Sequence, residues 1–143
     1  MSYQQLVLRT SLQGVRIGRF MKKEPITVSP ATSIEDLVNN YIYHYHFKMY
    51  PVVEGNQLKG VVTINQVKQV APEEWSVRTV GELAEECTVD NTISPQAQAT
   101  KALEQMNRVG VSRLLVVDHG KLVGIVTLKD MLTLLSLKVD TRV

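Results

Sequence analysis

The chain contains two copies of one sequence unit, and this repeat constrains the fold more than any other feature. The stretch LKGVVTINQ at residues 58–66 returns as LVGIVTLKD at residues 122–130. Upstream, TVSP at residues 27–30 returns as TISP at residues 92–95, one residue out of step with the later alignment. A one-residue difference in the intervening loop accounts for the step. The self-similarity indicates that one supersecondary unit is used twice.

The first copy predicts the order strand, helix, strand, strand, helix. A short strand at residues 26–28 precedes Thr32 and Glu35, which form a T-x-x-E capping box at a helix start. The apolar runs 49–53 and 59–63 predict a hairpin, and residues 64–70 begin a second helix. Pro51 favours an edge position or a bulge. Apolar residues at helical spacing form the inward stripe of the first helix: Ile34, Leu37, Val38, Tyr41, Ile42 and Tyr45.

The second copy repeats this order. Residues 92–93 predict a strand, and residues 113–117 and 122–127 a hairpin that leads into a helix at 128–137. Gly110 lies where the first helix of this copy should end. The inward positions of that helix are Ala99, Ala102, Leu103 and Met106.

The repeat predicts an α+β fold with a clear domain order. We expect an N-terminal linker or helix at 1–14, repeat 1 at 15–70, a junction at 71–78, repeat 2 at 79–137 and a tail at 138–143. A repeat of about 60 residues buries little core alone. We therefore expect the repeats to pack face to face with pseudo-twofold symmetry.

Composition restricts the classes of function. The 143 residues carry a net charge of +2, which gives no reason to expect nucleic-acid binding through bulk charge. The mean hydropathy of −0.04 is that of a soluble globular chain. No apolar run approaches the roughly 18 residues of a membrane span, and the N-terminus is too polar for a signal peptide. Cys87 alone cannot form an internal disulfide and fits a reducing compartment.

The two copies differ at the start of their last helix. Thr63 is followed by Gln66, whereas Thr127 is followed by Asp130. Both pairs can cap a helix, which is one reading. The other reading is a ribose site, because a carboxylate can accept from both hydroxyls of a cis-diol while an amide offers one acceptor oxygen. The free N–H groups of the helix start would face a phosphate.

The pattern of a T-V-S-P strand, a helix, P-V-V, a turn and G-h-h-T-x-x-D (h, apolar) resembles the CBS domain. Two in tandem look like a Bateman module that covers roughly residues 15–137. The resemblance implies a non-catalytic regulatory unit that binds AMP, ADP, ATP or S-adenosylmethionine in the cleft between repeats. The alternative is a ligand-free scaffold that only dimerises.

The resemblance also implies which residues would hold the ligand. In the second copy Asp130 would take the ribose, and Thr127 with Lys129 or Arg113 would meet phosphate. Apolar groups would enclose the adenine. The remaining positions of this site are Leu114, Thr92, Ile93, Thr88 and Val89, and the weaker site in the first copy comprises Thr27, Val28, Tyr50, Pro51, Thr63 and Gln66.

The flanking sequence resembles the C-terminal extension of membrane zinc metalloproteases of the site-2 protease family. The signals are residues 3–21, the helix end at 41–53 and the junction 70–75. The zinc-binding H-E-x-x-H is absent, so zinc would belong only to the parent domain. The resemblance implies a regulatory part on the cytoplasmic side of the membrane, with the parent protease as partner.

Other chemistry is disfavoured by the sequence. His44 and His46 point about 200° apart on a helix and cannot share a metal ion unless the backbone is extended there. Tyr41 and Tyr45 lie on the core stripe, which argues against a stacking platform for nucleic acid. Cys87 lacks a histidine partner, and we expect neighbouring Glu85 and Glu86 to raise its pKa.

Surplus leucines predict association. Clusters at both ends exceed what one small core usually absorbs, so we expect a homodimer or contact with a parent segment. The residues are Leu6, Leu8, Leu12, Leu132, Leu134, Leu135 and Leu137.

Overall fold

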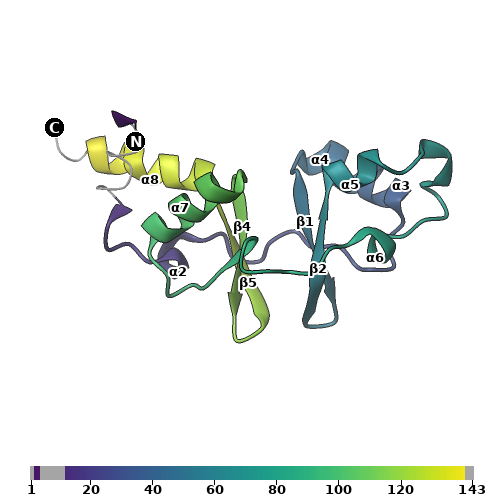
Figure 1. Ribbon diagram of the computed structural model, residues 1–143, viewed down its shortest axis with the longest axis horizontal. Coiled ribbons are helices and arrows are strands. Elements are labelled where there is room, and N and C mark those ends of the chain that lie inside the picture. Colours follow the sequence, from purple (N-terminus) through teal and green to yellow (C-terminus); the bar gives the residue numbers. More distant parts are fainter. Residues whose placement is uncertain (1, 4–11, 141–143) are drawn as a thin grey trace. The chain divides into compact units, whose positions relative to one another are not determined.

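A computed structural model describes residues 2–3 and 12–140 of the chain. It divides into two compact units (Figure 1). Unit 1 is Met1–Glu24 together with Thr88–Val143, and unit 2 is Pro25–Cys87. The α+β class and the two repeats are as predicted. The units do not coincide with the predicted repeats. Unit 1 includes the residues up to Glu24, which begin predicted repeat 1, and unit 2 includes residues 79–87, which begin predicted repeat 2.

Unit 1 is built on a three-stranded sheet. Strand β4 (Arg113–Asp118) pairs antiparallel with β5 (Lys121–Thr127) and parallel with the short β3 (Thr92–Ile93). Helices α7 (Ala99–Val109) and α8 (Leu128–Asp140) lie on one side of this sheet (Figure 1). Because β5 runs directly into α8, the sheet fixes where that helix begins.

The core of unit 1 lies between the sheet and these helices. Apolar side chains alternate toward it from β4 and β5, and α7 contributes one apolar stripe that ends at Gly110, which has a φ of 81°. Each fully buried aliphatic side chain contributes about 1.5–3 kcal/mol. The buried members are Leu12, Ile17, Ile93, Ala99, Ala102, Met106, Leu114, Val116, Val126 and Met131, with Leu103 packed against them.

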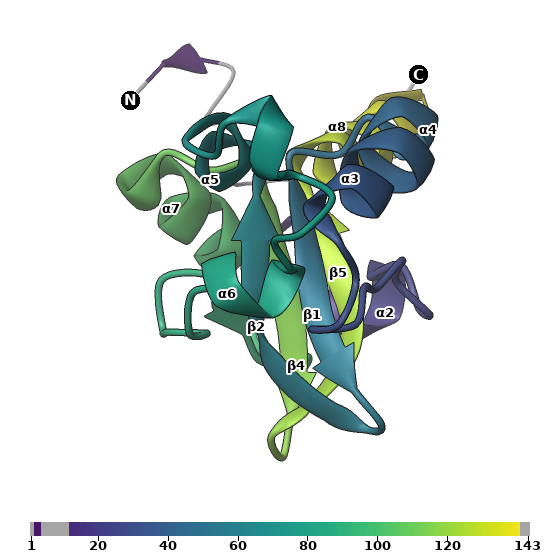
Figure 2. The ribbon, with the colours of Figure 1, turned by 90° about the vertical axis from the view of Figure 1, so that its right-hand side faces the viewer.

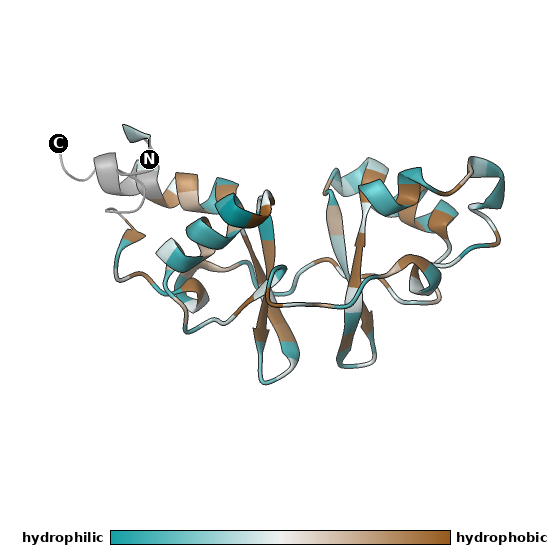
Figure 3. Ribbon diagram, viewed as in Figure 1, coloured by the Kyte–Doolittle hydropathy of each residue, from teal (hydrophilic) through white to brown (hydrophobic). Residues whose placement is uncertain are grey.

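Unit 2 is built on the hairpin of β1 (Met49–Glu54) and β2 (Gln57–Thr63), which is followed by α5 (Ile64–Lys68). The predicted strand at residues 26–28 is reduced to one parallel bridge between Val28 and Val52. Hydrophobic residues concentrate along the strands, whereas the hairpin tips are hydrophilic (Figure 3). Val28, Tyr50, Val52, Val62 and Val67 belong to the core of this unit together with the buried residues of its helices.

The long helix of unit 2 contains a π-helical stretch. Helix α3 (Ile34–Asp36) continues through the π-helix η1 (Leu37–Ile42) into α4 (Tyr43–Tyr45). The predicted inward stripe is confirmed, since Ile34, Leu37 and Val38 are buried and the remaining three members pack against the same core. Tyr43 is 69% exposed, as expected for the residue off that stripe.

The predicted capping box of this helix is wrong by one residue. Ser33 is the N-cap, and its hydroxyl accepts from the Asp36 N–H at 3.0 Å. Thr32 instead accepts from the Ser29 N–H at 3.2 Å, which closes the preceding turn. Both hydroxyls were available in the sequence, and the path of the turn decided which one caps the helix.

Two short helices precede the strands of the predicted repeats, and each packs within its own unit. Helix α2 (Ile17–Phe20) docks on unit 1, where the Gly18 N–H donates to Pro95 O at 2.8 Å. Helix α6 (Val80–Leu83) docks on unit 2, where the Gly81 N–H donates to Pro30 O at 2.9 Å (Figure 2). Both glycines allow the close approach, since a Cβ would lie 3.2 Å and 3.0 Å from these oxygens.

Both hairpins have the same irregularity. The register shifts between Val52 and Val53 in unit 2 and between Val116 and Val117 in unit 1. Pro51 lies in β1 opposite Val61, one position before the shift. Unit 1 has the bulge without a proline, so Pro51 is not its cause; the bulge belongs to the repeat.

The leucine clusters are partly absorbed within unit 1. Leu12 is fully buried and Leu134 packs against the core, so neither is surplus. Leu132 is 50% exposed. Leu6 and Leu8 lie outside the described residues, as do the side chains of Leu135 and Leu137. The homodimer stays a prediction.

Candidate functional site

The start of helix α8 in unit 1 holds the acidic residue that distinguishes the two copies. Thr127 is 7% exposed, and its Oγ1 accepts from the Asp130 N–H at 3.1 Å. This bond uses the Thr127 hydroxyl as acceptor and leaves its O–H free to donate. The backbone cap of the helix is therefore made by Thr127 and does not need the carboxylate of Asp130.

The Asp130 carboxylate is only partly satisfied within the described chain. Its Oδ1 lies 3.8 Å from the Lys22 Nζ, a long ion pair whose side chains are 20% and 61% exposed, respectively. Its Oδ2 is buried and has no hydrogen-bond partner among the described residues. An unsatisfied buried acceptor costs about 1–3 kcal/mol. Such an atom requires an explanation, and a ligand hydroxyl supplies one.

Gln66, the counterpart in unit 2, uses its side chain differently. Its Oε1 accepts from the Thr63 N–H at 2.8 Å, and its own N–H donates to Thr63 Oγ1 at 3.3 Å. This is the complete reciprocal capping box that the sequence allowed. The amide of Gln66 is thus occupied by its own helix start, which the carboxylate of Asp130 is not.

Glu82 shows what a longer acid does at a helix start. Its Oε2 accepts from the Thr79 N–H at 2.6 Å, and this bond is the main reason that its pKa is lowered. Arg78 nearby lowers the pKa further. The box requires the reach of Glu or Gln, and Asp is one methylene shorter. Chain length therefore explains why Asp130 caps less completely than Gln66.

The strands bring some of the other predicted residues to this place. Arg113 lies directly opposite Thr127 in the β4–β5 register. Leu114 is fully buried in the core, so only its backbone can face a ligand. Lys129 is exposed on the first turn of α8. Arg113, Thr127 and Asp130 therefore share one end of the hairpin, whereas Leu114 serves packing.

The predicted adenine segment precedes β3. Ile93 is 6% exposed and belongs to the core. Thr92 pairs with Leu115 in the parallel register, two residues from Arg113. The loop before it is exposed, and Val89 is 84% accessible to solvent. Ile93 thus lines the core and Val89 projects into solvent, where an apolar ligand ring could cover it.

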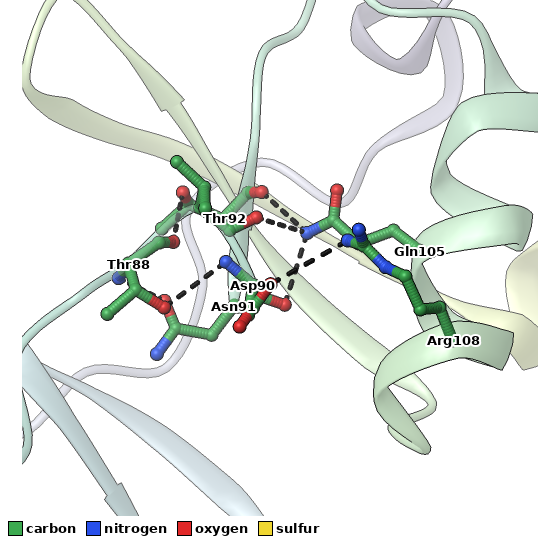
Figure 4. Close-up of polar contacts among 7 residues, drawn as sticks. Thr88, Asp90, Asn91, Thr92, Gln105 and Arg108 are labelled. Carbon is green, nitrogen blue, oxygen red and sulfur yellow. Dashed lines mark hydrogen bonds and ion pairs between the residues drawn. The ribbon is translucent and has the colours of Figure 1, made fainter.

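Gln105 holds this loop, and sequence reasoning missed it (Figure 4). Its Nε2 donates to the carbonyl oxygens of Val89, Asp90 and Thr92 at 3.0, 3.1 and 2.8 Å. Gln105 is only 7% exposed, although a glutamine at this position of α7 would be expected on the polar, solvent-facing side of the helix. Polar residues at near-inward positions of a helix are the available signal, and it is a weak one.

Further bonds within the loop fix its shape. The Thr88 N–H donates to Asn91 Oδ1 at 2.7 Å, and the Thr92 hydroxyl donates to Thr88 O at 2.7 Å. An exposed ion pair joins Arg108 to Asp90 at 3.7 Å (Figure 4). The loop that carries Thr88 and Val89 is therefore held against α7 at several points.

The weaker predicted site falls within unit 2. The Val28 N–H donates to Pro51 O at 3.0 Å, which places Thr27 beside β1. Val28, Tyr50 and Pro51 are buried, and the Tyr50 hydroxyl donates to Tyr41 O at 3.1 Å. Thr63 and Gln66 form the capping box. The side chains predicted here are thus mostly engaged in core packing and capping.

Lys22 is the second residue that sequence reasoning missed. The signal was present, because Gly18 and Gly81 mark a further repeated segment that places Lys22 and Glu85 at equivalent positions. The Lys22 backbone pairs with Ile125, as Glu85 pairs with Val61. Lys22 precedes the first repeat's strands in the sequence but belongs to unit 1, so alignment of the strands and long helices alone did not connect it to Asp130.

The remaining candidates are the two histidines of the first repeat and Cys87. The part of the chain that the structure describes holds no group of three metal-ligating side chains. His44 packs edge-on to Tyr45 at a ring distance of 4.5 Å, and His46 has a φ of 65°. Cys87 is partly buried, and burial raises its pKa. The predicted direction is right, but the predicted cause, neighbouring Glu85 and Glu86, is wrong.

None of the described helices combines the length and the apolar character that crossing a membrane requires.

Comparison with characterised sequences gives relatives among larger proteins. The chain is 33% identical over 125 residues to "Putative zinc metalloprotease Rip3" of Mycobacterium tuberculosis, covering 86% of this chain and 32% of that protein. It is 28% identical over 130 residues to a zinc metalloprotease of Methanocaldococcus jannaschii, covering 91% and 35%. The chain thus spans about a third of the length of these relatives.

Comparison with solved structures confirms the fold. The CBS domain of a bacterial CNNM/CorC family Mg²⁺ transporter in complex with ATP matches with a TM-score of 0.75 and 21% identity, over 92% of this chain and 94% of that one. CBSX2 in complex with AMP matches with a TM-score of 0.75 and 24% identity, over 89% and 99%. These similarities concern the fold alone.

The family model for the CBS domain matches twice, at residues 17–73 and 80–137. The two matches cover both sequence repeats and include Thr63, Gln66, Thr127 and Asp130. The CBS domain is a regulatory and non-catalytic domain. On this evidence the chain belongs to the CBS domain family, of which it carries two copies in tandem.

Proposed function

We propose that this chain is a regulatory module that binds an adenosine-containing ligand at the start of helix α8. Asp130 would accept hydrogen bonds from the ribose hydroxyls, and Thr127 would donate to a phosphate. The observation that carries the proposal is the buried Asp130 Oδ2, which has no hydrogen-bond partner among the described residues. Solved CBS pairs with AMP and ATP support the ligand class.

The chemistry of a cis-diol fits this carboxylate. Two adjacent hydroxyls can donate to two oxygens of one carboxylate, in charge-assisted bonds that are stronger than neutral ones. Oδ2 has no competitor among the described residues, and the Lys22 Nζ, at 3.8 Å from Oδ1, is a weak one. The amide of Gln66 lacks a second acceptor and is already bound to Thr63. We therefore assign the site to the second copy.

The loop that Gln105 holds would provide the adenine contacts. Thr88 and Val89 lie on it, and Thr92 begins the strand beside Arg113 and Leu114. Ile93 and Leu114 would contribute backbone groups, since their side chains are in the core. Lys129 and Arg113 would add positive charge near the phosphate.

The attached protein would be a membrane zinc metalloprotease. This rests on the names of relatives of which the chain covers about a third. A ligand that binds one state of the module more tightly than another would shift the activity of such a parent by that difference in affinity. The module would then lie on the cytoplasmic side of the membrane.

A mutation pair tests the site. Asp130→Ala removes the ribose acceptors, and we expect the affinity for AMP in calorimetry to fall about 100-fold, which corresponds to about 2.7 kcal/mol. Because the Asp130 N–H still caps through Thr127, the thermal midpoint without ligand should not fall. Gln66→Ala is the matched control, which should lower stability by about 1 kcal/mol and leave AMP affinity unchanged.

The same experiment separates the proposal from the scaffold alternative. A ligand at about 100 times its dissociation constant stabilises by about 2.7 kcal/mol, so a thermal-shift screen of AMP, ADP, ATP and S-adenosylmethionine should show a clear response. No response to any of the four, or unchanged AMP affinity in Asp130→Ala, would reject the ligand site. A concentration-dependent dimer without ligand response would then favour the scaffold.

A further inference from the structure

The position next to the proposed ligand site carries opposite charges in the two units. Lys22 and Ile125 exchange backbone hydrogen bonds of 2.9 Å, and Glu85 and Val61 exchange bonds of 2.9 Å in the same way. Asp130 follows Ile125 at the same sequence distance at which Gln66 follows Val61. Lys22 and Glu85 therefore occupy equivalent ladder positions beside the two helix starts.

The backbone at these positions has little freedom to shift. A Cβ on Gly124 would lie 2.7 Å from Lys22 O, and one on Gly60 would lie 2.4 Å from Glu85 O. The glycines thus allow the crossing segment to lie against the strand, and the reciprocal hydrogen bonds hold it there. The backbone positions from which the side chains of Lys22 and Glu85 extend are therefore fixed.

Lys22 is placed to act on more than Asp130. Its side chain is 61% exposed and lies 3.8 Å from Oδ1, which is too long for a good hydrogen bond. An ammonium group has three donors, so the contact with Asp130 leaves capacity for another acceptor. An exposed pair of this kind contributes at most about 1 kcal/mol to folding, and its geometry is easily exchanged.

We propose that Lys22 makes the Asp130 site selective for a nucleoside that carries a phosphate, in preference to the free nucleoside or to the cationic S-adenosylmethionine. This rests on the proposed ribose site. When the diol engages the carboxylate, the Lys22 ammonium turns to the phosphate on the same ribose. Lys129, on the first turn of α8, adds a second positive charge to the same side of the site.

The charge balance of the two units follows from this assignment. In unit 1 the pair Lys22 and Asp130 is neutral before the ligand arrives, so an anionic ligand meets no net repulsion from it. In unit 2 the equivalent pair is Glu85 and Gln66, which carries a net negative charge. Glu85 therefore disfavours a phosphate at the place where Gln66 already fails to offer a second acceptor.

The test compares AMP, adenosine and S-adenosylmethionine by isothermal titration calorimetry on the full chain at constant salt. Lys22→Met keeps the aliphatic stem and removes the charge. We expect AMP to bind about tenfold more weakly to this variant, since a charge pair near the surface is worth about 1–2 kcal/mol. The affinity for adenosine should change by less than about twofold, because adenosine has no phosphate for Lys22 to contact. Lys22→Met also frees Asp130 Oδ1 from its cation.

Lys23→Met is the matched control. Lys23 is the exposed neighbour of Lys22, and its removal changes net charge equally. Lys23→Met should change the affinities for AMP and for adenosine by no more than about twofold. The preference for AMP should also shrink with added salt in the wild type and less so in Lys22→Met. Circular dichroism melts of both variants show whether the fold is kept.

The outcomes separate this inference from the proposed function. If Asp130→Ala abolishes AMP and adenosine binding but Lys22→Met changes neither, or weakens both equally, the inference is wrong and the ribose site stands. Tighter wild-type binding of S-adenosylmethionine than of AMP would also overturn the inference. If the wild type binds none of the three compounds, the proposed function is wrong and the selectivity proposal with it.

Discussion

Helices α5 and α8 begin at equivalent points of the two copies, yet their third residues have different uses. Gln66 turns back to the Thr63 N–H, while Asp130 leaves that bond unmade and keeps one buried oxygen without a partner among the described residues. The Gln66 side chain has the length that the cap requires, so its acceptor oxygen is occupied by the helix start. The shorter acid makes only part of the cap, so that its carboxylate keeps acceptor capacity, which is what the proposed ligand site requires.

The comparison extends to the segments that cross the two hairpins. Each hairpin has a glycine where the crossing backbone approaches, and each crossing segment carries a charged residue at the paired position, Lys22 opposite Ile125 and Glu85 opposite Val61. Lys22 and Glu85 therefore differ in charge within one conserved backbone frame. The two copies share the backbone arrangement and differ in the side chains beside it, and on the proposed function these side chains decide what each copy binds.

The largest expected loss of stability comes from substitutions at the glycines against which the crossing segments pack. Gly60→Ala would place a Cβ 2.4 Å from the backbone oxygen of Glu85, whereas the corresponding distance for Gly124→Ala is 2.7 Å from Lys22 O. We expect urea unfolding to show a loss of about 3 kcal/mol for Gly60→Ala and about 2 kcal/mol for Gly124→Ala. Both contacts are with backbone, so the crossing segment itself must move.

Exposed neighbours on the same strands provide the controls. Lys59→Ala and Lys121→Ala should each change stability by less than about 0.5 kcal/mol. Gly60→Ala and Gly124→Ala with losses no larger than these controls would mean that the crossing segments are not held against the strands in solution.

The next effect concerns the loop before β3 in unit 1, which Gln105 holds. Gln105→Leu removes the donor to three carbonyl oxygens, and we expect a loss of about 1–2 kcal/mol because water can reach part of the loop. Amide hydrogen exchange at Thr88 and Asp90 should accelerate. AMP affinity should fall as well, since the adenine segment would no longer be held.

Asn40 is the equivalent position in unit 2 and gives the matched control. It is exposed, and its amide donates to Asp36 Oδ1 within the same helix. Asn40→Leu should therefore alter stability by no more than about 0.5 kcal/mol. Equal losses in both variants would show that Gln105 acts through helix propensity and not through the loop.

The smallest effect sharpens the comparison by converting one copy toward the other. Gln66→Asp combined with Glu85→Lys gives unit 2 the side chains that we assign to ligand binding in unit 1. The reciprocal cap bond is lost, at a cost of about 1 kcal/mol. Calorimetry should then detect a second, weaker AMP binding event, and Gln66→Asp alone should give less. No second event in the double variant would mean that other unit 1 residues are required.

Much of the fold was predictable because the repeat fixes it. The hairpins, the inward stripes of both long helices and the Gly110 helix end follow from local patterns that depend on backbone geometry and water exclusion. The helix start at Ser33 was misplaced because two neighbouring hydroxyls could each cap, and local sequence does not state which turn the chain takes.

The candidate site was only partly predictable. Thr127 and Asp130 could be named because they lie within one repeated motif, whereas Arg113 was named only through the resemblance to CBS domains; the structure places it opposite Thr127 in the hairpin register. Leu114 and Ile93 were named with them, and their side chains belong to the core instead. Gln105 was missed since a buried glutamine on a helix face looks like a solvated one.

By itself the sequence determined that one unit is used twice, that each unit contains a helix followed by a hairpin and a second helix, and that the copies differ at Asp130. These are properties of neighbouring residues. Only the tertiary structure decided that residues up to Glu24 pack with the second copy and that Lys22 lies beside Asp130. These pairings join residues far apart in the sequence, and close packing of backbone against glycine, which no local pattern encodes, selects them.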